Sequence, residues 1–215
     1  GVASLYVGVS ETATVCEATP YEIDCPIVFY GSSITQGGCA SRPGNSYQGH
    51  LSRKFDMDYI NLGFSGSALG EDVIADHIAN LPMSVFVMDY DHNAPNAEHL
   101  EKTHYAGYKR FRAKQPTTPI IMASKPDWDL VNDFSDPETN EKRMKIIENT
   151  YLRAKAEGDE NVYFINGFTD FYPEDLRGDC TVDGCHPNDL GFYRMAENIR
   201  PVLEEILKGE KGERL

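Results

Sequence analysis

Short apolar runs alternate along the chain with longer amphipathic stretches. The apolar runs lie at residues 26–30, 58–62, 84–88, 118–123 and 161–165. Because each run is short and nearly continuously apolar, it is typical of a parallel strand that is buried on both faces of a sheet. Helices are predicted at the amphipathic stretches between and after these runs, at 46–56, 71–80, 97–115, 139–157 and 189–208.

The alternation of strands and helices predicts an α/β fold, a three-layer α/β/α sandwich with a doubly wound, mainly parallel five-stranded sheet. The last helix has the clearest pattern, because Asn188 or Asp189 is placed to cap its start. Its apolar residues recur at helical spacing: Leu190, Met195, Ile199, Leu203, Ile206 and Leu207. In such a sheet, ligands bind beyond the carboxyl ends of the strands.

The first 25 residues differ from the rest of the chain. The segment "SLYVGV" predicts a short strand, and the Thr- and Pro-punctuated segment after it has no helical period. We therefore interpret residues 1–25 as a leader or as the end of a preceding β domain. The sandwich domain is expected to cover residues 26–208, and residues 209–215 are expected to form a frayed tail.

Composition and charge disfavour nucleic acids and membranes as binding partners. The 215 residues are 40% hydrophobic and carry a formal net charge of −14, which is typical of a soluble globular domain that repels nucleic acid and anionic membranes. No apolar run is long enough to span a bilayer, so we expect no membrane insertion. A processed or engineered fragment is one interpretation of a chain that begins with Gly1 and shows no cleavable apolar segment, so the location is weakly determined. A cytoplasmic location is slightly favoured over a secreted one. The oligomeric state has no signature in the sequence.

The five cysteines cannot all pair within one chain. Free thiols in a reducing compartment are the favoured interpretation, and the alternative disulfides are Cys16–Cys25 and Cys180–Cys185. A zinc site is disfavoured, because no CxxC pair and no suitably spaced histidine is present.

Polar clusters follow the predicted strands where ligands are expected. The first strand is followed by "GSSIT", the second by "NLGFSG" and the third by "DYDHN", and "DGCHPND" precedes the last helix. Hydrolysis of an ester needs a nucleophile, a base and an oxyanion stabiliser. A serine after the first strand is activated if His186 accepts its proton while the other ring nitrogen of His186 donates to Asp183.

The segments "GSSITQGG", "NLGFSG" and "DGCHPNDLG", with an Asn after the third strand, resemble the sequence blocks of the SGNH (GDSL-type) hydrolase superfamily. "CASRPGNSY" and "VDGCHPNDLGFYRMAE" resemble its bacterial carbohydrate-esterase-like branch. The resemblance covers residues 26 to about 207 and implies the flavodoxin-like SGNH fold. It also implies a nucleophile at Ser33, a triad completed by Asp183 and His186, and no metal or organic cofactor.

For the oxyanion hole, the resemblance implies the backbone N–H groups of Ser33 and Gly66 and the side chain of Asn93. Gly63 is the alternative to Gly66, and Ser32 is the alternative nucleophile. The chain departs from the family pattern twice. The usual Gly-Asp-Ser is Gly-Ser-Ser at residues 31–33, and the usual Gly-x-Asn-Asp reads Asp-His-Asn-Ala at residues 91–94.

Each of these residues also has an ordinary structural interpretation. Ser33 fits a turn or a helix cap, and Asp183 and His186 fit a capping loop before the last helix. Gly66 fits a tight turn that needs a positive φ angle, and Asn93 fits a loop cap. Catalysis is favoured because the four clusters occur together at the strand ends.

Other polar and aromatic residues offer alternatives. Asp89, Asp91 and His92, with His186, would suit a metal-dependent phosphoesterase. Adjacent strand residues point to opposite faces, so we do not expect the first three to converge on one ion. Trp128 is either a sugar platform or a loop anchor. Tyr47 and Arg42 lie near the first sequence block and are candidates to line the substrate pocket, which spacing alone does not show.

These observations predict a serine esterase that removes a small acyl group, acetyl in the favoured interpretation, from a small-molecule or glycan ester. The loops after the strands are rich in Gly, Ser, Asn and Asp, which suits a short polar pocket rather than a long apolar groove. The alternatives are a lipid or lysophospholipid esterase with the same triad, the phosphoesterase, and a non-catalytic carbohydrate-binding domain.

Overall fold

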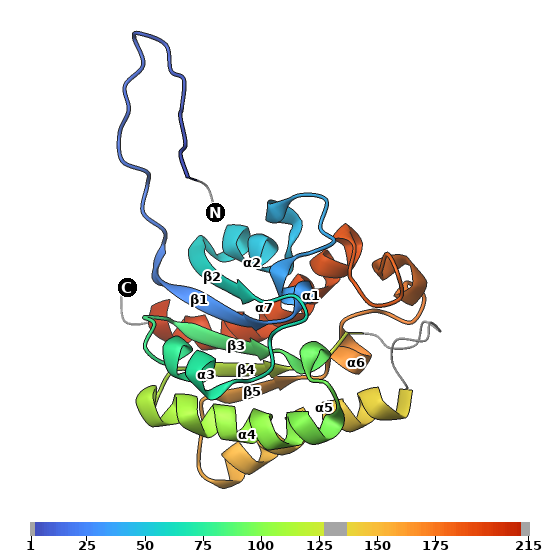
Figure 1. The fold of residues 1–215 in the computed structure, drawn as a ribbon. Coiled ribbons are helices and arrows are strands. Elements are labelled where there is room, and N and C mark those ends of the chain that lie inside the picture. The colour runs from blue at the N-terminus through green and yellow to red at the C-terminus, as the bar shows by residue number, and fades with distance from the viewer. Residues whose placement is uncertain (1–2, 127–136, 212–215) are drawn as a thin grey trace.

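The computed structural model describes residues 3–126 and 137–211, which fold around a five-stranded sheet (Figure 1). The sheet order is β2-β1-β3-β4-β5, and every pair of neighbours is parallel. The strands are β1 (Ile23–Gly31), β2 (Met57–Gly63), β3 (Val85–Asp89), β4 (Ile120–Ala123) and β5 (Val162–Ile165). The predicted sheet is therefore confirmed, and all of its carboxyl ends meet at one edge.

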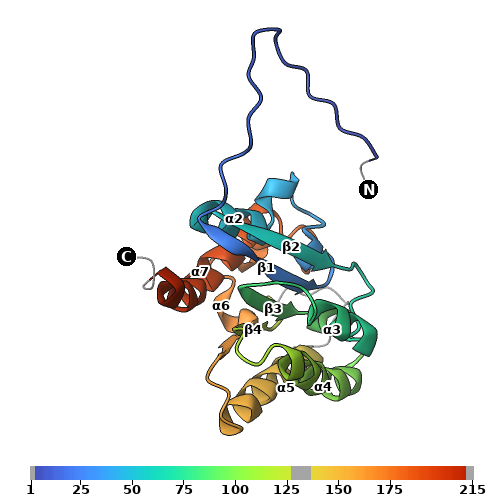
Figure 2. The same cartoon turned by 90° about the vertical axis from the view of Figure 1, so that its left-hand side faces the viewer.

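Helices cover both faces of the sheet, which confirms the predicted three-layer sandwich (Figures 1 and 2). One face packs against α2 (Tyr47–Phe55) and α7 (Asp189–Lys211). The other packs against α3 (Asp72–Ile78), α4 (Ala97–Lys114) and α5 (Pro137–Ala156). Each helix lies within a few residues of a predicted amphipathic stretch. Every described helix is too short or too polar to cross a lipid bilayer.

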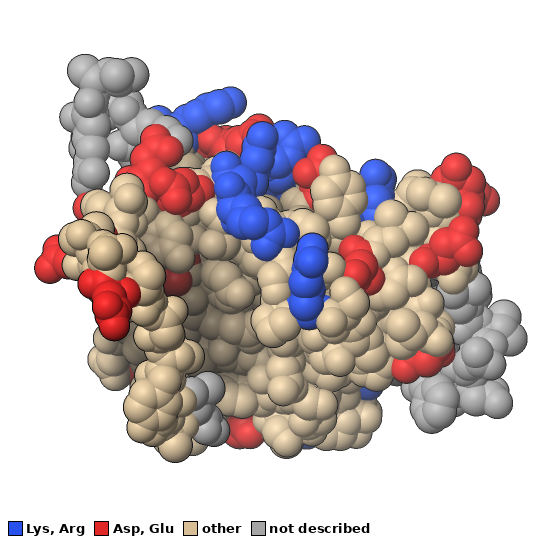
Figure 3. Space-filling model, turned by 90° about the horizontal axis from the view of Figure 1, so that it is seen from above, with Lys and Arg blue, Asp and Glu red and all other residues tan. Residues whose placement is uncertain are grey.

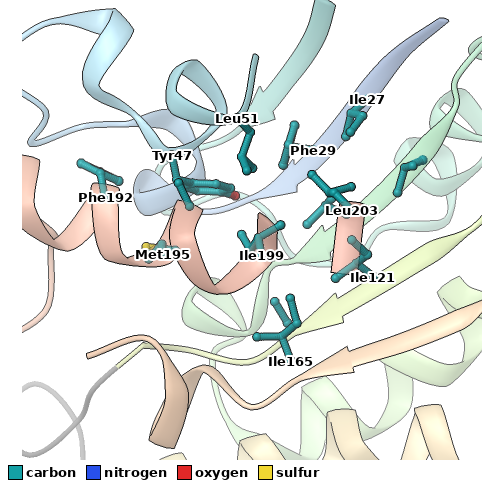
Figure 4. Packing of buried hydrophobic residues seen from close by; sticks show 14 of the residues in the cluster. Ile27, Phe29, Tyr47, Leu51, Ile121, Ile165, Phe192, Met195, Ile199 and Leu203 are labelled. Carbon is teal, nitrogen blue, oxygen red and sulfur yellow. The ribbon is translucent and has the colours of Figure 1, made fainter. Parts of the chain in front are cut away.

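The consecutive apolar residues of β1 pack into two hydrophobic cores, one on each face of the sheet. Ile27 and Phe29 point to the face covered by α2 and α7, where they pack near Leu51 and Leu203 (Figure 4). Val28 belongs to the core on the opposite face. All three strand residues are fully buried. Side chains alternate across a strand, so a strand buried on both faces needs an unbroken apolar run.

Several short elements lie at the strand ends and were not predicted. They are α1 (Ser33–Gln36), α6 (Gly167–Asp170) and the 3₁₀ helices η1 (Pro43–Asn45), η2 (Asp91–Asn93) and η3 (Arg177–Cys180). Three or four residues cannot display a helical period, so the hydrophobic pattern does not reveal them. Two of them, α1 and η2, carry candidate site residues.

The ends of the chain differ from the predicted boundaries. Within residues 3–22 the structure has no strand, so the strand expected in "SLYVGV" is wrong: Leu5, Tyr6 and Val7 are exposed and have no neighbouring strand with which to pair. This segment projects from the domain (Figures 1 and 2). β1 begins at Ile23 rather than at residue 26, and α7 continues to Lys211, into the expected tail. All five cysteines lie in the described residues, and none is in a disulfide.

Candidate active site

The two adjacent serines after β1 take different places. Ser32 is fully buried, and its Oγ accepts a hydrogen bond from the Ile34 N–H at 3.1 Å, so Ser32 caps helix α1. Ser33 is the first residue of α1, and its Oγ lies 2.9 Å from Nε2 of His186. The structure thus brings Ser33, and not its buried neighbour, to the imidazole.

The loop that carries His186 is closed on itself before α7 begins. A bridge joins Thr181 to Pro187, and the Val182 N–H donates to the His186 carbonyl at 2.9 Å. At the end of the loop, the side chain of Asn188 accepts from the Gly191 N–H at 3.1 Å, which caps the first turn of the helix. These contacts therefore hold the loop that carries the imidazole.

The carboxylate of Asp183 orients that imidazole. Its Oδ2 lies 2.7 Å from Nδ1 of His186, and its Oδ1 accepts from the N–H groups of Cys185 at 2.9 Å and His186 at 2.7 Å. Partial burial acts to raise the pKa of Asp183, but these hydrogen bonds outweigh burial and lower it below the usual value. An ionised carboxylate can only accept from Nδ1, so Nδ1 carries the proton and Nε2 is left to accept one from Ser33.

Each of the three predicted oxyanion donors keeps a hydrogen without an acceptor among the described residues. The N–H groups of Ser33 and Gly66 have no acceptor within the described part of the chain. Asn93 donates one Nδ2 hydrogen to the Phe64 carbonyl at 2.8 Å, which leaves its second hydrogen available. The alternative donor Gly63 is already engaged, since its N–H binds Oδ1 of Asn61 at 2.9 Å.

Gly63 and Gly66 have different structural reasons to be glycine. A Cβ on Gly63 would overlap the backbone of Gln36 in α1, so Gly63 permits close packing of β2 against α1. Gly66 has a φ angle of +70°, a conformation that glycine adopts without strain. Its turn is exposed and open to a ligand.

Buried hydrogen bonds that the sequence did not predict support helix α1. The Thr35 carbonyl accepts from the side chains of Gln48 at 2.7 Å and Asn61 at 2.8 Å. The Thr35 hydroxyl and the Tyr47 hydroxyl both donate to Oδ2 of Asp89 at 3.1 Å. Tyr47 is fully buried, so the prediction that it lines the pocket is wrong. The only sequence signal was a carboxylate directly after the apolar run of β3.

Asp89, Asp91 and His92 converge, contrary to the prediction. Their ligand atoms lie within 4.8 Å of one another, because β3 ends at Asp89 and the chain turns back through η2. Three of these atoms are buried without a hydrogen-bond partner among the described residues: Oδ1 of Asp89, Oδ1 of Asp91 and Nε2 of His92. This donor set fits a divalent cation. The fourth suggested ligand, His186, is instead engaged with Ser33 and Asp183.

Burial perturbs the titration of all three groups. Burial, followed by the nearby charge of Asp91, raises the pKa of Asp89 well above its usual value. Burial raises the pKa of Asp91 to about 6, against the opposing hydrogen bond that Asp91 accepts from the Lys125 N–H. Burial also lowers the pKa of His92 well below its usual value. Each group therefore favours its neutral form more strongly than it would in water.

The loop after α1 is tied to the start of α7. Asp189 accepts from the Ser41 N–H at 2.8 Å, the Ser41 hydroxyl at 2.6 Å and the Asn45 amide at 2.8 Å. Arg42 is exposed, and its Nε donates to Asn45 at 3.0 Å. Trp128 lies outside the described residues, so its two suggested roles stay predictions.

A polar groove of about 430 Å³ lies between α2 and α7, lined by His50, Leu51, Lys54, Tyr193, Ala196, Glu197 and Arg200. Figure 3 shows Lys and Arg side chains gathered near the middle of the face seen from above, with Asp and Glu on its flanks. Although the chain is acidic as a whole, this face is locally mixed. The groove begins one turn into the helix that follows His186.

Comparison with solved structures identifies several relatives. A protein from Bacteroides ovatus ATCC 8483, classed as a GDSL-like lipase, is 33% identical with a TM-score of 0.78, over 89% of this chain and 55% of that chain. A two-domain esterase active on acetylated mannans, co-crystallised with mannopentaose, is 20% identical with a TM-score of 0.62, over 85% and 49%. A family two carbohydrate esterase from Clostridium thermocellum, in complex with cellohexaose, is 16% identical with a TM-score of 0.65, over 92% and 67%.

The last two similarities show a shared fold. The chain spans about half the length of the first two relatives. No curated protein matches it significantly. Residues 24–204 match the sequence profile described as the GDSL-like lipase/acylhydrolase family, which covers most of the chain and includes every candidate site residue. The chain belongs to the GDSL-like lipase/acylhydrolase family.

Proposed function

We propose that Ser33, His186 and Asp183 are the catalytic triad of an esterase that removes a small acyl group, acetyl, from a carbohydrate. The observation that carries this proposal is the continuous hydrogen-bond chain from Ser33 Oγ to His186 Nε2 at 2.9 Å and from His186 Nδ1 to Asp183 Oδ2 at 2.7 Å. A serine hydroxyl at the start of a helix does not need such partners for its structural role, but a nucleophile does.

In the proposed reaction, the Ser33 oxygen attacks the ester carbonyl while its proton moves to His186 Nε2. The developing oxyanion accepts hydrogen bonds from the N–H groups of Ser33 and Gly66 and from the amide of Asn93. The imidazolium then protonates the leaving alcohol, and the acyl group stays on Ser33. Water, deprotonated by His186, attacks the acyl carbonyl; the bond to Ser33 then breaks, the acid leaves, and the imidazolium returns its proton to the Ser33 oxygen. Throughout, Asp183 holds Nδ1 and stabilises the transient imidazolium.

The carbohydrate part of the proposal is supported by the composition of the loops after the strands and by one polar groove on the surface. The loops after β1 and β2 offer Ser, Asn and Gly rather than an apolar wall. The polar groove between α2 and α7 includes the exposed ring of Tyr193, which suits stacking on a sugar. Two structural relatives are carbohydrate-active esterases, and their substrates enter here as support for the proposal only.

One experiment tests the chemistry. The enzyme is treated with a serine-reactive fluorophosphonate or with EDTA, and hydrolysis of p-nitrophenyl acetate is followed. We expect the fluorophosphonate to abolish turnover and EDTA to leave it unchanged. The reverse pattern would favour a metal-dependent hydrolase built on Asp89, Asp91 and His92.

A second experiment tests the substrate. We expect kcat/KM for p-nitrophenyl esters to fall steeply from acetyl to octanoyl, and acetylated xylo- and manno-oligosaccharides to release acetate. A preference for octanoyl, with no acetate released from any of these glycans, would support a lipid esterase instead.

A further inference from the structure

The turn that presents Asn93 lacks the residues that the family pattern places around it. Asp91 and Ala94 stand where that pattern has glycine and an acid. In this structure, a residue from a distant helix contacts the turn at both ends. Nη1 of Arg143, in α5, donates to the Asp91 carbonyl at 2.6 Å and to the Ala94 carbonyl at 2.7 Å.

These two contacts are made where water is scarce. Asp91 is 1% exposed and Ala94 is 3% exposed, so their carbonyls depend on protein donors. Arg143 is itself half-buried, and burial lowers its pKa, which the charge of Asp91 partly offsets. A guanidinium stays protonated at any pH relevant to a protein, so both hydrogen bonds are charge-assisted. One nitrogen therefore joins the two ends of the turn.

The rest of the turn depends on weaker or single contacts. The Asn93 N–H donates to the Tyr90 carbonyl at 3.1 Å, which closes η2. The Asn93 side chain donates to Phe64 at 2.8 Å, in the loop that leads to Gly66. Arg143 thus fixes the backbone on both sides of Asn93, and the Phe64 contact fixes the direction of its amide.

We propose that Arg143 is a positioning residue that holds the amide of Asn93 at the oxyanion, in place of the local motif that this chain lacks. The proposal rests on the proposed role of Asn93 in the oxyanion hole. Among the described residues, the hydrogen bonds of Arg143 all go to backbone carbonyls of the turn, so it acts on the transition state through Asn93. A displacement of about 1 Å in such a donor is enough to weaken catalysis strongly.

The test compares Arg143→Met, which keeps the length of the side chain without its charge, with Arg143→Lys and with a control. The control is Lys145→Ala, which removes an exposed ion pair with Glu141 on the same helix. We expect Arg143→Met to lower kcat for p-nitrophenyl acetate about 10- to 100-fold with KM changed less than about threefold. Arg143→Lys should retain part of the activity, and Lys145→Ala should match the wild type.

The decisive measurement repeats Arg143→Met in an Asn93→Ala background. If Arg143 acts through Asn93, the second substitution lowers kcat less than about threefold further. Full additivity of the two losses, an effect on KM alone, or an unchanged kcat in Arg143→Met would each overturn the inference. If Asn93→Ala alone keeps wild-type kcat, the proposed oxyanion role fails instead. Should Arg143→Met unfold by circular dichroism, Arg143→Lys in both backgrounds carries the same test.

Discussion

Replacing Asp183 by Asn tests the orientation of the imidazole with little change in shape. Oδ1 of Asp183 accepts two backbone N–H groups, whereas Oδ2 contacts only His186 Nδ1. The single oxygen of an Asn side chain is therefore best placed on the two backbone donors. Its NH₂ group then faces Nδ1, which must accept rather than donate. The proton moves to Nε2, where it points at Ser33 and removes the base.

The size of the loss follows from this inverted tautomer. The base is available only in the rare form in which Nδ1 is protonated against the amide, and the imidazolium loses its counter-charge. A fall of about 10⁴ in kcat is expected, which corresponds to about 5.5 kcal/mol of transition-state stabilisation. Stability should change little, because the side chain is 47% exposed and both backbone hydrogen bonds are retained.

The assay is kcat with p-nitrophenyl acetate, with the thermal midpoint as a check on folding. Asp179→Asn is the matched control, since it removes an exposed carboxylate from the preceding 3₁₀ helix η3. The control should keep wild-type activity. If Asp183→Asn retains more than a tenth of wild-type kcat, or if it loses activity only by unfolding, the argument from the tautomer is wrong.

Three further outcomes are expected. Ser33→Ala should lower kcat at least 10³-fold, whereas Ser32→Ala should act mainly on stability through the lost cap, by about 1 kcal/mol; kinetics and urea unfolding of both variants check this. His186→Ala should lower kcat on the order of 10³-fold or more, and unchanged activity in that variant would exclude His186 as the base. The pKa of Asp91 is raised to about 6, so the folded state holds this proton more tightly than the unfolded state does. Its stabilising effect is present below pH 4 and is lost as pH rises through 6. Relative to wild type, Asp91→Asn should therefore gain up to about 3 kcal/mol in free energy of unfolding between pH 4 and pH 7, as measured in urea. A constant difference would contradict the raised pKa.

The sequence predicted the long helices and the strands because their burial produces a recognisable pattern of apolar residues. All five strands and the five long helices lie within a few residues of their predicted ranges. The strand expected in residues 4–9 failed for the opposite reason, since an apolar run becomes a strand only where another strand accepts its hydrogen bonds. The short helices α1 and η2 were not predicted, because capping and turn interactions determine them and they have no hydrophobic pattern.

The candidate site divides in the same way. Sequence blocks selected Ser33, Asp183 and His186, and the folded chain brings their side chains together. The supports of these residues were not predicted. Tyr47 meets Asp89 across 42 positions, and Arg143 meets Asp91 across 52. Such contacts depend on the directions of the side chains and on how the helices pack. The spacing of residues along a single sequence does not show either. The convergence of Asp91 and His92 was missed because a turn was treated as strand.

The distance between Ser33 and His186, the proposed nucleophile and base, depends on contacts outside the proposed triad. Ser33 and His186 lie on separate elements, and His186 is too exposed for burial alone to hold it, with 32% of its side chain accessible. Asp189, three residues after the imidazole, binds Ser41 through both carboxylate oxygens, which ties the loop after α1 to the start of α7. Tyr47 also stacks on Phe192 in α7, with ring centroids 6.5 Å apart, and donates to Asp89 Oδ2, which accepts from Thr35 in α1 as well. Tyr47 therefore links the packing of α2 on α7 to the hydrogen-bond network that supports α1, the helix that carries Ser33. A change in that packing would move the serine and the histidine relative to each other while leaving each correctly folded, and it would lower kcat more than stability.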